Sequence, residues 1–136
     1  MTGSKTNRIF WVKLALVLLL ALAIPALGIV EQVYMKDSFD ELCVDCREII
    51  ALLSEGDDAG AYRKTLDMKA RWEKTRDMLE FMYPNADIKE VAPQIGELQG
   101  DLEADLADDA IARARMIESL AENSKNLLSF KWKNIL

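Results

Sequence analysis

The sequence contains no histidine among its 136 residues. Histidine is the side chain whose ordinary pKa lies closest to neutrality, and it is also the commonest ligand of protein-bound metals. Its absence excludes histidine acid–base catalysis, histidine ligation of a metal and a histidine pH switch.

Alternation of apolar and polar residues with a period of two is also missing, as are hairpin turn signals. Apolar residues instead recur at three- and four-residue spacings, between short connections. Short connections between amphipathic helices favour antiparallel neighbours. We therefore predict an all-α fold, in which an N-terminal transmembrane helix is followed by an antiparallel up-down bundle of about four helices.

Charged residues are absent from Leu14 to Val30, a run of seventeen residues. At a rise of about 1.5 Å per residue this run reaches about 25 Å, and extension over Ile9–Val12 brings it to the roughly 30 Å of a hydrocarbon core. Residues 1–30 contain three basic residues and no acid. Positive charge stays on the cytoplasmic side. We predict a cytoplasmic leader at 1–13, a transmembrane helix at 14–30 that meets the lipid bilayer through residues 9–30, and an extracytoplasmic remainder.

A cleaved signal peptide is the alternative interpretation of the same segment. Ala26–Gly28 supplies small residues at the spacing that signal peptidase recognises, so cleavage near Gly28 would yield a secreted protein. We favour an uncleaved cell-membrane anchor because the apolar character continues through Ile29 and Val30. Both interpretations place the same domain outside the cytoplasm.

The extracytoplasmic part is predicted to be acidic. The whole chain carries a net charge of −6, and residues 31–136 alone carry −9. Such a domain is repelled by nucleic acid and by anionic lipid, so we expect no nucleic-acid partner. The acids lack the spacing of a calcium loop or of a carboxylate–histidine site, so we expect no metal. The acids considered for such a site are Glu97, Asp101, Asp105, Asp108 and Asp109.

The domain at 38–136 is predicted to follow a juxtamembrane connector at 31–37, which can also continue the spanning helix. A capping box at Ser38–Glu41 would open its first helix, and Gly56 would end it before an aspartate caps the next one. Pro93 would either lie in the first turn of the third helix, after a turn at 83–87 and a looser segment, or kink a longer helix, and we favour the first. The expected inward residues of the second helix are Tyr62, Leu66, Trp72, Met78, Leu79 and Met82. The expected second and fourth helices are 59–82 and 107–130.

Cysteine is scarce, and the only two residues form the motif Cys43–Val44–Asp45–Cys46. On a helix this spacing suits a dithiol redox pair, with Cys43 as nucleophile and Cys46 as resolving thiol. It also suits a local disulfide, or two small apolar residues of a buried stripe. Because no βαβ pattern surrounds the motif, we favour packing, with or without a disulfide, and expect no catalytic residue and no cofactor.

Trp72 and Trp132 are candidate partner-binding residues, because tryptophan is enriched at the centres of protein interfaces. The alternative is that each is a core residue of its helix.

The layout of the chain resembles a family catalogued as domain of unknown function 4363. The likeness rests on the basic leader, the single apolar span, Trp72 in the second helix, a turn before a helix led by Ile88, and the terminal Asn134–Ile135–Leu136. The resemblance implies a small single-pass bacterial membrane protein, and it implies no activity. Members commonly have a histidine in the turn between the second and third helices, where this chain has residues 83–87 without one.

The leading functional hypothesis is a non-enzymatic, membrane-anchored module of the bacterial envelope that binds a protein partner or another copy of itself. A membrane-tethered thiol/disulfide oxidoreductase using the cysteine pair is one alternative. A helical bundle that senses a small ligand is another.

Overall fold

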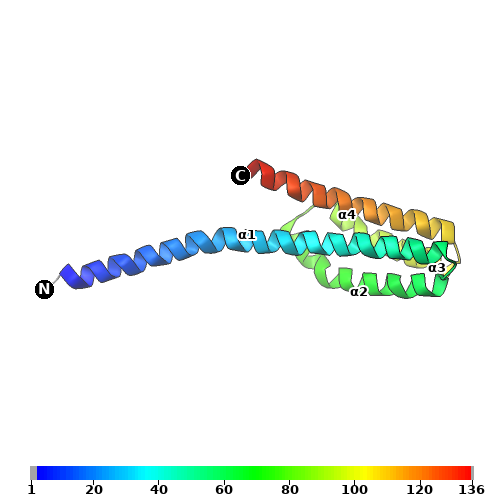
Figure 1. Ribbon diagram of the computed structural model, residues 1–136, viewed down its shortest axis with the longest axis horizontal. Coiled ribbons are helices and arrows are strands. Elements are labelled where there is room, and N and C mark those ends of the chain that lie inside the picture. Colours follow the sequence, from blue (N-terminus) through cyan, green and yellow to red (C-terminus); the bar gives the residue numbers. More distant parts are fainter. Residues whose placement is uncertain (1–2, 136) are drawn as a thin grey trace. The chain divides into compact units, whose positions relative to one another are not determined.

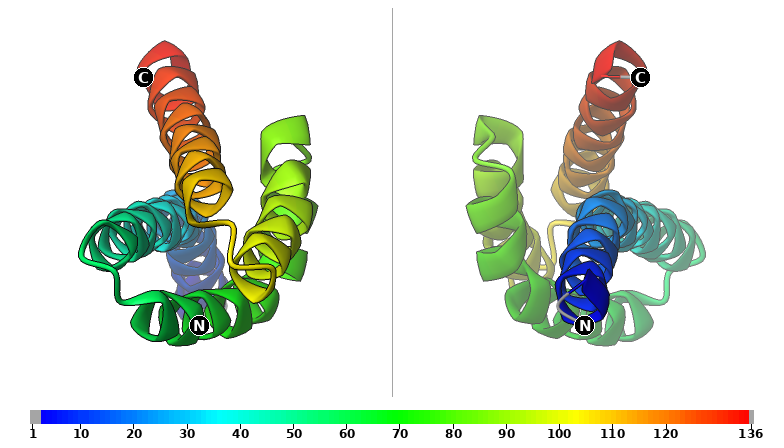
Figure 2. Two further views of the ribbon diagram at one scale, coloured as in Figure 1. Left: turned by 90° about the vertical axis from the view of Figure 1, so that its right-hand side faces the viewer. Right: turned by 90° about the vertical axis from the view of Figure 1, so that its left-hand side faces the viewer.

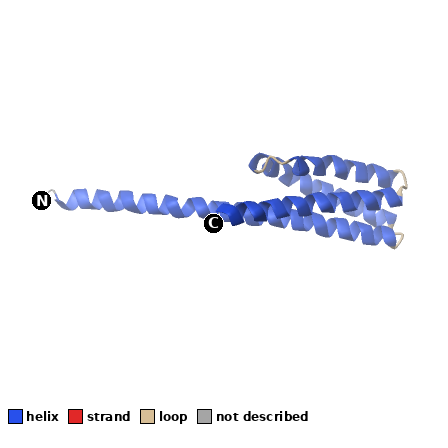
Figure 3. Cartoon of the chain, turned by 90° about the horizontal axis from the view of Figure 1, so that it is seen from above, coloured by secondary structure: helices blue, strands red, loops and turns tan. Residues whose placement is uncertain are grey.

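The computed structural model describes the backbone of residues 3–135 and the side chains of residues 7–131, 133 and 134. Four helices account for nearly all of it, α1 (Gly3–Ser54), α2 (Asp58–Met82), α3 (Ala86–Glu103) and α4 (Ala107–Ile135) (Figure 1). No strand occurs within the described backbone (Figure 3). The all-α prediction is confirmed. The chain divides into two compact units, Met1–Tyr34 and Met35–Leu136, which are described separately.

The first unit is the N-terminal part of α1. It contains a helical segment long and apolar enough to cross a membrane, a test that a signal sequence also passes. The large apolar side chains of this segment are exposed, and Phe10 and Trp11 make an edge-to-face contact with ring centroids 6.1 Å apart. Pro25 lies inside the helix without ending it.

The second unit is a bundle formed by residues 35–54 of α1 together with α2, α3 and α4 (Figure 2). Each helix of the bundle runs antiparallel to the next, and α4 returns to lie beside residues 35–54 of α1 (Figure 1). Polar pairs join the four helices around the rim of the bundle. They are Lys64–Glu48 at 2.6 Å between α2 and α1, Lys69–Gln99 at 3.0 Å between α2 and α3, Arg113–Glu97 at 2.6 Å between α4 and α3, and Lys125–Asp40 at 2.6 Å between α4 and α1.

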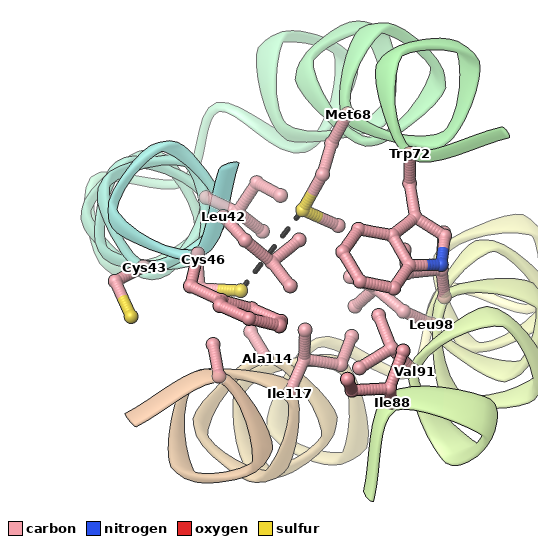
Figure 4. Close-up of a cluster of buried hydrophobic side chains, with 14 of the residues drawn as sticks. Leu42, Cys43, Cys46, Met68, Trp72, Ile88, Val91, Leu98, Ala114 and Ile117 are labelled. Carbon is pink, nitrogen blue, oxygen red and sulfur yellow. Dashed lines mark hydrogen bonds between the residues drawn. The ribbon is translucent and has the colours of Figure 1, made fainter. Parts of the chain in front are cut away.

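The core of the bundle lies inside this rim and takes apolar side chains from all four helices (Figure 4). The rings of Phe39 and Trp72 meet within it with centroids 6.2 Å apart. Each large side chain buried in this way contributes about 1.5–3 kcal/mol. The largest fully buried apolar side chains are Phe39, Ile49, Met68, Leu79, Ile88, Ile95, Leu98, Ile117 and Val91.

The capping box predicted at Ser38 is wrong, because α1 passes through this position without a break. A capping box needs an N-cap residue with non-helical backbone angles and unpaired N–H groups in the following turn. Nothing between residues 31 and 38 disfavours helix, so those N–H groups are paired within the helix instead. Residues 31–37 instead belong to the continuous helix α1, as in the alternative in which the connector continues the preceding helix.

The predicted start of the third helix near Pro93 is also wrong. Helix α3 begins at Ala86, with the Asn85 side chain accepting a hydrogen bond of 3.0 Å from the backbone N–H of Asp87. Pro93 lies on the exposed face, so the carbonyl oxygen four residues earlier can be solvated. Burial of Ile88 and Val91 stabilises this first part of α3 by more than the roughly 3 kcal/mol that an internal proline costs.

The turn before α2 agrees with the sequence analysis. Gly56 adopts a left-handed φ of 80°, and Asp57 caps α2 by accepting a hydrogen bond of 2.9 Å from the Gly60 N–H. The predicted inner face of α2 is partly wrong, because Leu66 and Met78 are exposed. Thr65 and Met68 are buried in α2 instead, and the Thr65 hydroxyl is satisfied by donating to the Ala61 carbonyl.

Candidate functional site

The cysteine pair lies on the inner side of α1, within the bundle. Cys43 is 2 % exposed and Cys46 is 0 % exposed, and both are free thiols. Their side chains point in different directions (Figure 4). The Cys46 thiol lies 4.0 Å from the Met68 sulfur in the core, whereas the Cys43 thiol lies 3.9 Å from the backbone carbonyl oxygen of Glu118 on α4. The structure therefore contains a reduced, packed pair.

The surroundings of the two thiols favour their neutral form. Burial raises the pKa of Cys43 to about 11, assisted by the Glu122 carboxylate and opposed by Lys125. Burial also raises the pKa of Cys46 well above its ordinary value, with Cys43 as the next contribution. A thiolate is the reactive form of cysteine, and redox-active cysteines have lowered pKa values. This environment disfavours Cys43 as a nucleophile and agrees with packing as its role.

Asp45, between the two cysteines in sequence, is the buried charge of the bundle. It is 4 % exposed, and its carboxylate faces α2, where it pairs with the Arg71 guanidinium and with the Lys64 ammonium at 3.2 Å. Hydrogen bonds to Glu48 first, and then to Asp45, raise the pKa of Lys64. Sequence reasoning missed Asp45. The sequence pattern that could have identified it is an acidic residue between two residues, Cys43 and Cys46, that face inward on one helix.

A hollow of about 480 Å³ opens to solvent beside Asp45, between α1 and α2. We call it the α1–α2 groove. Val44 contributes an apolar surface to it and is 56 % exposed. Lys64 and Arg71 pair with Asp45, and Asp40 pairs with Lys125, so Asp37 and Glu41 give the groove its negative character. The groove is lined by Asp37, Asp40, Glu41, Val44, Asp45, Lys64 and Arg71.

Of the two candidate tryptophans, the structure describes the side chain of Trp72 alone. Trp72 is a buried core residue packed against Phe39, and its indole N–H has no hydrogen-bond partner. It therefore cannot anchor a partner at the surface of this bundle. The side chain of Trp132 lies outside the described residues.

The carboxylates considered for a metal site have other surroundings. Glu97 and Asp101 accept from the Arg113 guanidinium at 2.6 and 3.4 Å. Asp105 lies in the α3–α4 turn with a left-handed φ of 56°. Within the part of the chain that the structure describes, no group of three metal-ligating side chains lies together.

No family model, no curated protein and no solved structure matches this chain. The resemblance to the uncharacterised single-pass family therefore stays a prediction.

Proposed function

We propose that the protein is a membrane-anchored, extracytoplasmic helical module that binds a protein partner through the α1–α2 groove. The observation that carries this proposal is the groove itself, an open concave surface in which exposed Val44 is flanked by carboxylates. Protein interfaces combine an apolar contact of this kind with a polar rim.

The charge of the groove favours a partner segment that carries lysine or arginine. Asp37 and Glu41 are exposed one helical turn apart on α1, so both can reach one bound chain. The net charge of −9 on residues 31–136 adds a long-range attraction for cations. The groove is open to solvent, whereas small-molecule sites enclose most of their ligand. An extended basic peptide fits this surface better than a small metabolite does.

The anchor supports a role at a membrane. The groove residues of α1 begin at Asp37, seven positions after the end of the apolar segment at Val30, and one helix contains both. Lys5, Arg8 and Lys13 favour a cytoplasmic N-terminus, which puts the bundle on the other side of the membrane. Partners would then be bound close to the envelope membrane.

The alternative of a thiol oxidoreductase has less support. Both thiols are buried, and their pKa values are raised rather than lowered. A protein-binding role uses the exposed face of the same motif, at Val44, and needs no thiol chemistry.

Site-specific photo-crosslinking of the full-length protein in cells tests the proposal. Val44 is replaced by p-benzoylphenylalanine, and exposed Met116 on α4 is the matched control position. We expect a discrete adduct at position 44, identified by mass spectrometry as a protein with a basic segment, and none at position 116.

Charge reversal gives the second arm of this experiment. Asp37→Lys with Glu41→Lys should remove the adduct. Glu73→Lys with Asp77→Lys, an equally spaced exposed pair on α2, should leave it unchanged. Equal adducts at positions 44 and 116, or an adduct that survives reversal in the groove, would refute the proposal.

A further inference from the structure

The C-terminal part of α4 differs in charge from the rest of the bundle. Residues 123–136 contain three lysines and no acid, in a domain whose net charge is −9. The same stretch contains Phe130 and Trp132 in sequence. Lysines next to aromatic residues at a helix end are typical of segments that lie in a membrane interface.

The register between α1 and α4 places this segment at one end of the bundle. Arg47 pairs with Glu118 at 2.6 Å, and Asp40 pairs with Lys125 at 2.6 Å, so seven positions backward on α1 match seven forward on α4. Five further positions bring Phe130 level with Met35, the first residue of the bundle unit.

This end of the bundle is close to the apolar segment along the chain. Only residues 31–34 separate Val30 from Met35, and a chain segment of this length spans at most about 18 Å even when fully extended. That limit holds whatever the angle between the two units.

Exposed aromatic and basic side chains gather at the same end. Phe130 is 65 % exposed on α4, and Phe81, in the last turn of α2, is 87 % exposed. The Lys131 ammonium lies 4.4 Å from the centre of the Tyr83 ring, beside an open hollow of about 310 Å³ at the start of α3. We call Phe81, Tyr83, Phe130, Lys131 and Lys133 the basal surface.

We propose that the basal surface docks on the anionic phospholipid headgroups of the membrane that holds residues 9–30. This inference rests on the anchoring part of the proposed function. Lysines are attracted to anionic headgroups, and aromatic rings prefer the boundary between headgroups and acyl chains. The acidic remainder of the bundle is repelled by the same lipids.

Nitroxide accessibility on the full-length protein tests the docking. The protein is reconstituted into phosphatidylcholine vesicles with or without phosphatidylglycerol, and a spin label is attached at Asn134→Cys. Ser119→Cys, exposed earlier on α4, is the control position. The buried native cysteines should not compete for the label. We expect the label at position 134 to be accessible to oxygen and shielded from a water-soluble nickel complex only in the anionic vesicles.

Removing the charges of Lys131 and Lys133 tests whether the docking depends on these lysines. Each lysine near an anionic surface changes the docking equilibrium about fivefold, so Lys131→Gln with Lys133→Gln should weaken docking about 25-fold. Lys74→Gln with Arg115→Gln, both exposed elsewhere on the bundle, should have no effect. Circular dichroism checks that each variant remains helical.

Two results would overturn the docking. One is a label at position 134 that is as water-accessible as the label at position 119 in anionic vesicles. The other is shielding that is equal in neutral vesicles or unaffected by removing the two lysines. Flotation of the vesicles separates failure of the docking from failure of the proposed anchor. A chain that does not float with the vesicles refutes the anchor and the docking together, whereas a chain that floats but is not shielded at position 134 refutes the docking alone.

Discussion

Iodoacetamide should react with the two cysteines of the folded protein much more slowly than with the same cysteines after unfolding. The pKa of Cys43 is raised from 9.0 to about 11, which lowers the thiolate fraction at neutral pH about 100-fold. Burial slows the reaction further, because the reagent reaches a side chain that is 2 % exposed only when the bundle opens locally. The expected protection of Cys43 is therefore at least about 100-fold.

The free energy of unfolding should fall as the pH rises above 9. The folded state holds the Cys43 proton up to a pH of about 11, whereas the unfolded state releases it near 9.0. The stabilisation linked to this thiol is therefore complete below pH 9 and is lost as the pH rises through about 11. Two pKa units correspond to about 3 kcal/mol of stability. The alkylation rate of folded Cys43 should rise about tenfold per pH unit over the same interval.

The assay uses full-length protein in detergent and intact-mass detection of each adduct. Cys46→Ala isolates the Cys43 thiol, Cys43→Ala isolates the Cys46 thiol, and each variant unfolded in guanidinium gives the reference rate. If Cys43 of the folded protein reacted at neutral pH as fast as in guanidinium, burial would not protect this thiol. The oxidoreductase hypothesis would then regain support.

Three further predictions concern stability, measured as the free energy of unfolding of the detergent-solubilised chain in guanidinium. Trp72→Ala should destabilise the protein by about 3–5 kcal/mol through lost packing against Phe39. Trp72→Phe should cost clearly less, because the indole N–H that it removes has no hydrogen-bond partner. Equal losses of stability in the two variants would contradict this account. Gly56→Ala should cost about 1 kcal/mol, because Gly56 has a left-handed φ of 80°. Gly96→Ala should stabilise the protein by about 0.5–1 kcal/mol, because it removes a glycine from a helix and nothing lies within 4 Å of the added Cβ. Effects of the same sign would show that backbone conformation does not explain the two results. Asp45→Ala should cost about 2 kcal/mol. This loss is small for a buried ion pair, because water can solvate Lys64 and Arg71 once the carboxylate is removed. An unchanged free energy of unfolding would show that the two ion pairs contribute nothing to stability.

The sequence was sufficient to predict the all-α fold and the first turn of the bundle. Apolar residues at three- and four-residue spacings predicted helices, and Gly56 with Asp57 marked the first turn of the bundle. Two local signals for helix starts, at Ser38 and Pro93, were misleading. Ser38 is a good capping residue in the wrong place, and Pro93 is tolerated because it faces solvent.

The candidate site was much less accessible to sequence reasoning. Whether a cysteine is activated depends on the charges that other helices bring to it, and Glu122 comes from α4, far along the chain from Cys43. The pairing of Asp45 with Lys64 and Arg71 depends on the register between α1 and α2, which no local pattern specifies. The same holds for the α1–α2 groove.

The way the rim of the bundle closes has a consequence for synthesis of the chain on the ribosome. The contacts that join α4 to α1 link residues separated by 71 to 85 positions, so the part of α1 that contacts α4 stays uncovered until the last helix has been made. Neighbouring hairpins can form earlier, whereas this final pairing has to close the longest loop and should set the pace of folding. Ribosome-bound chains that end before Glu118 should therefore present the Cys43 side of α1 to chaperones, and longer chains should progressively cover it.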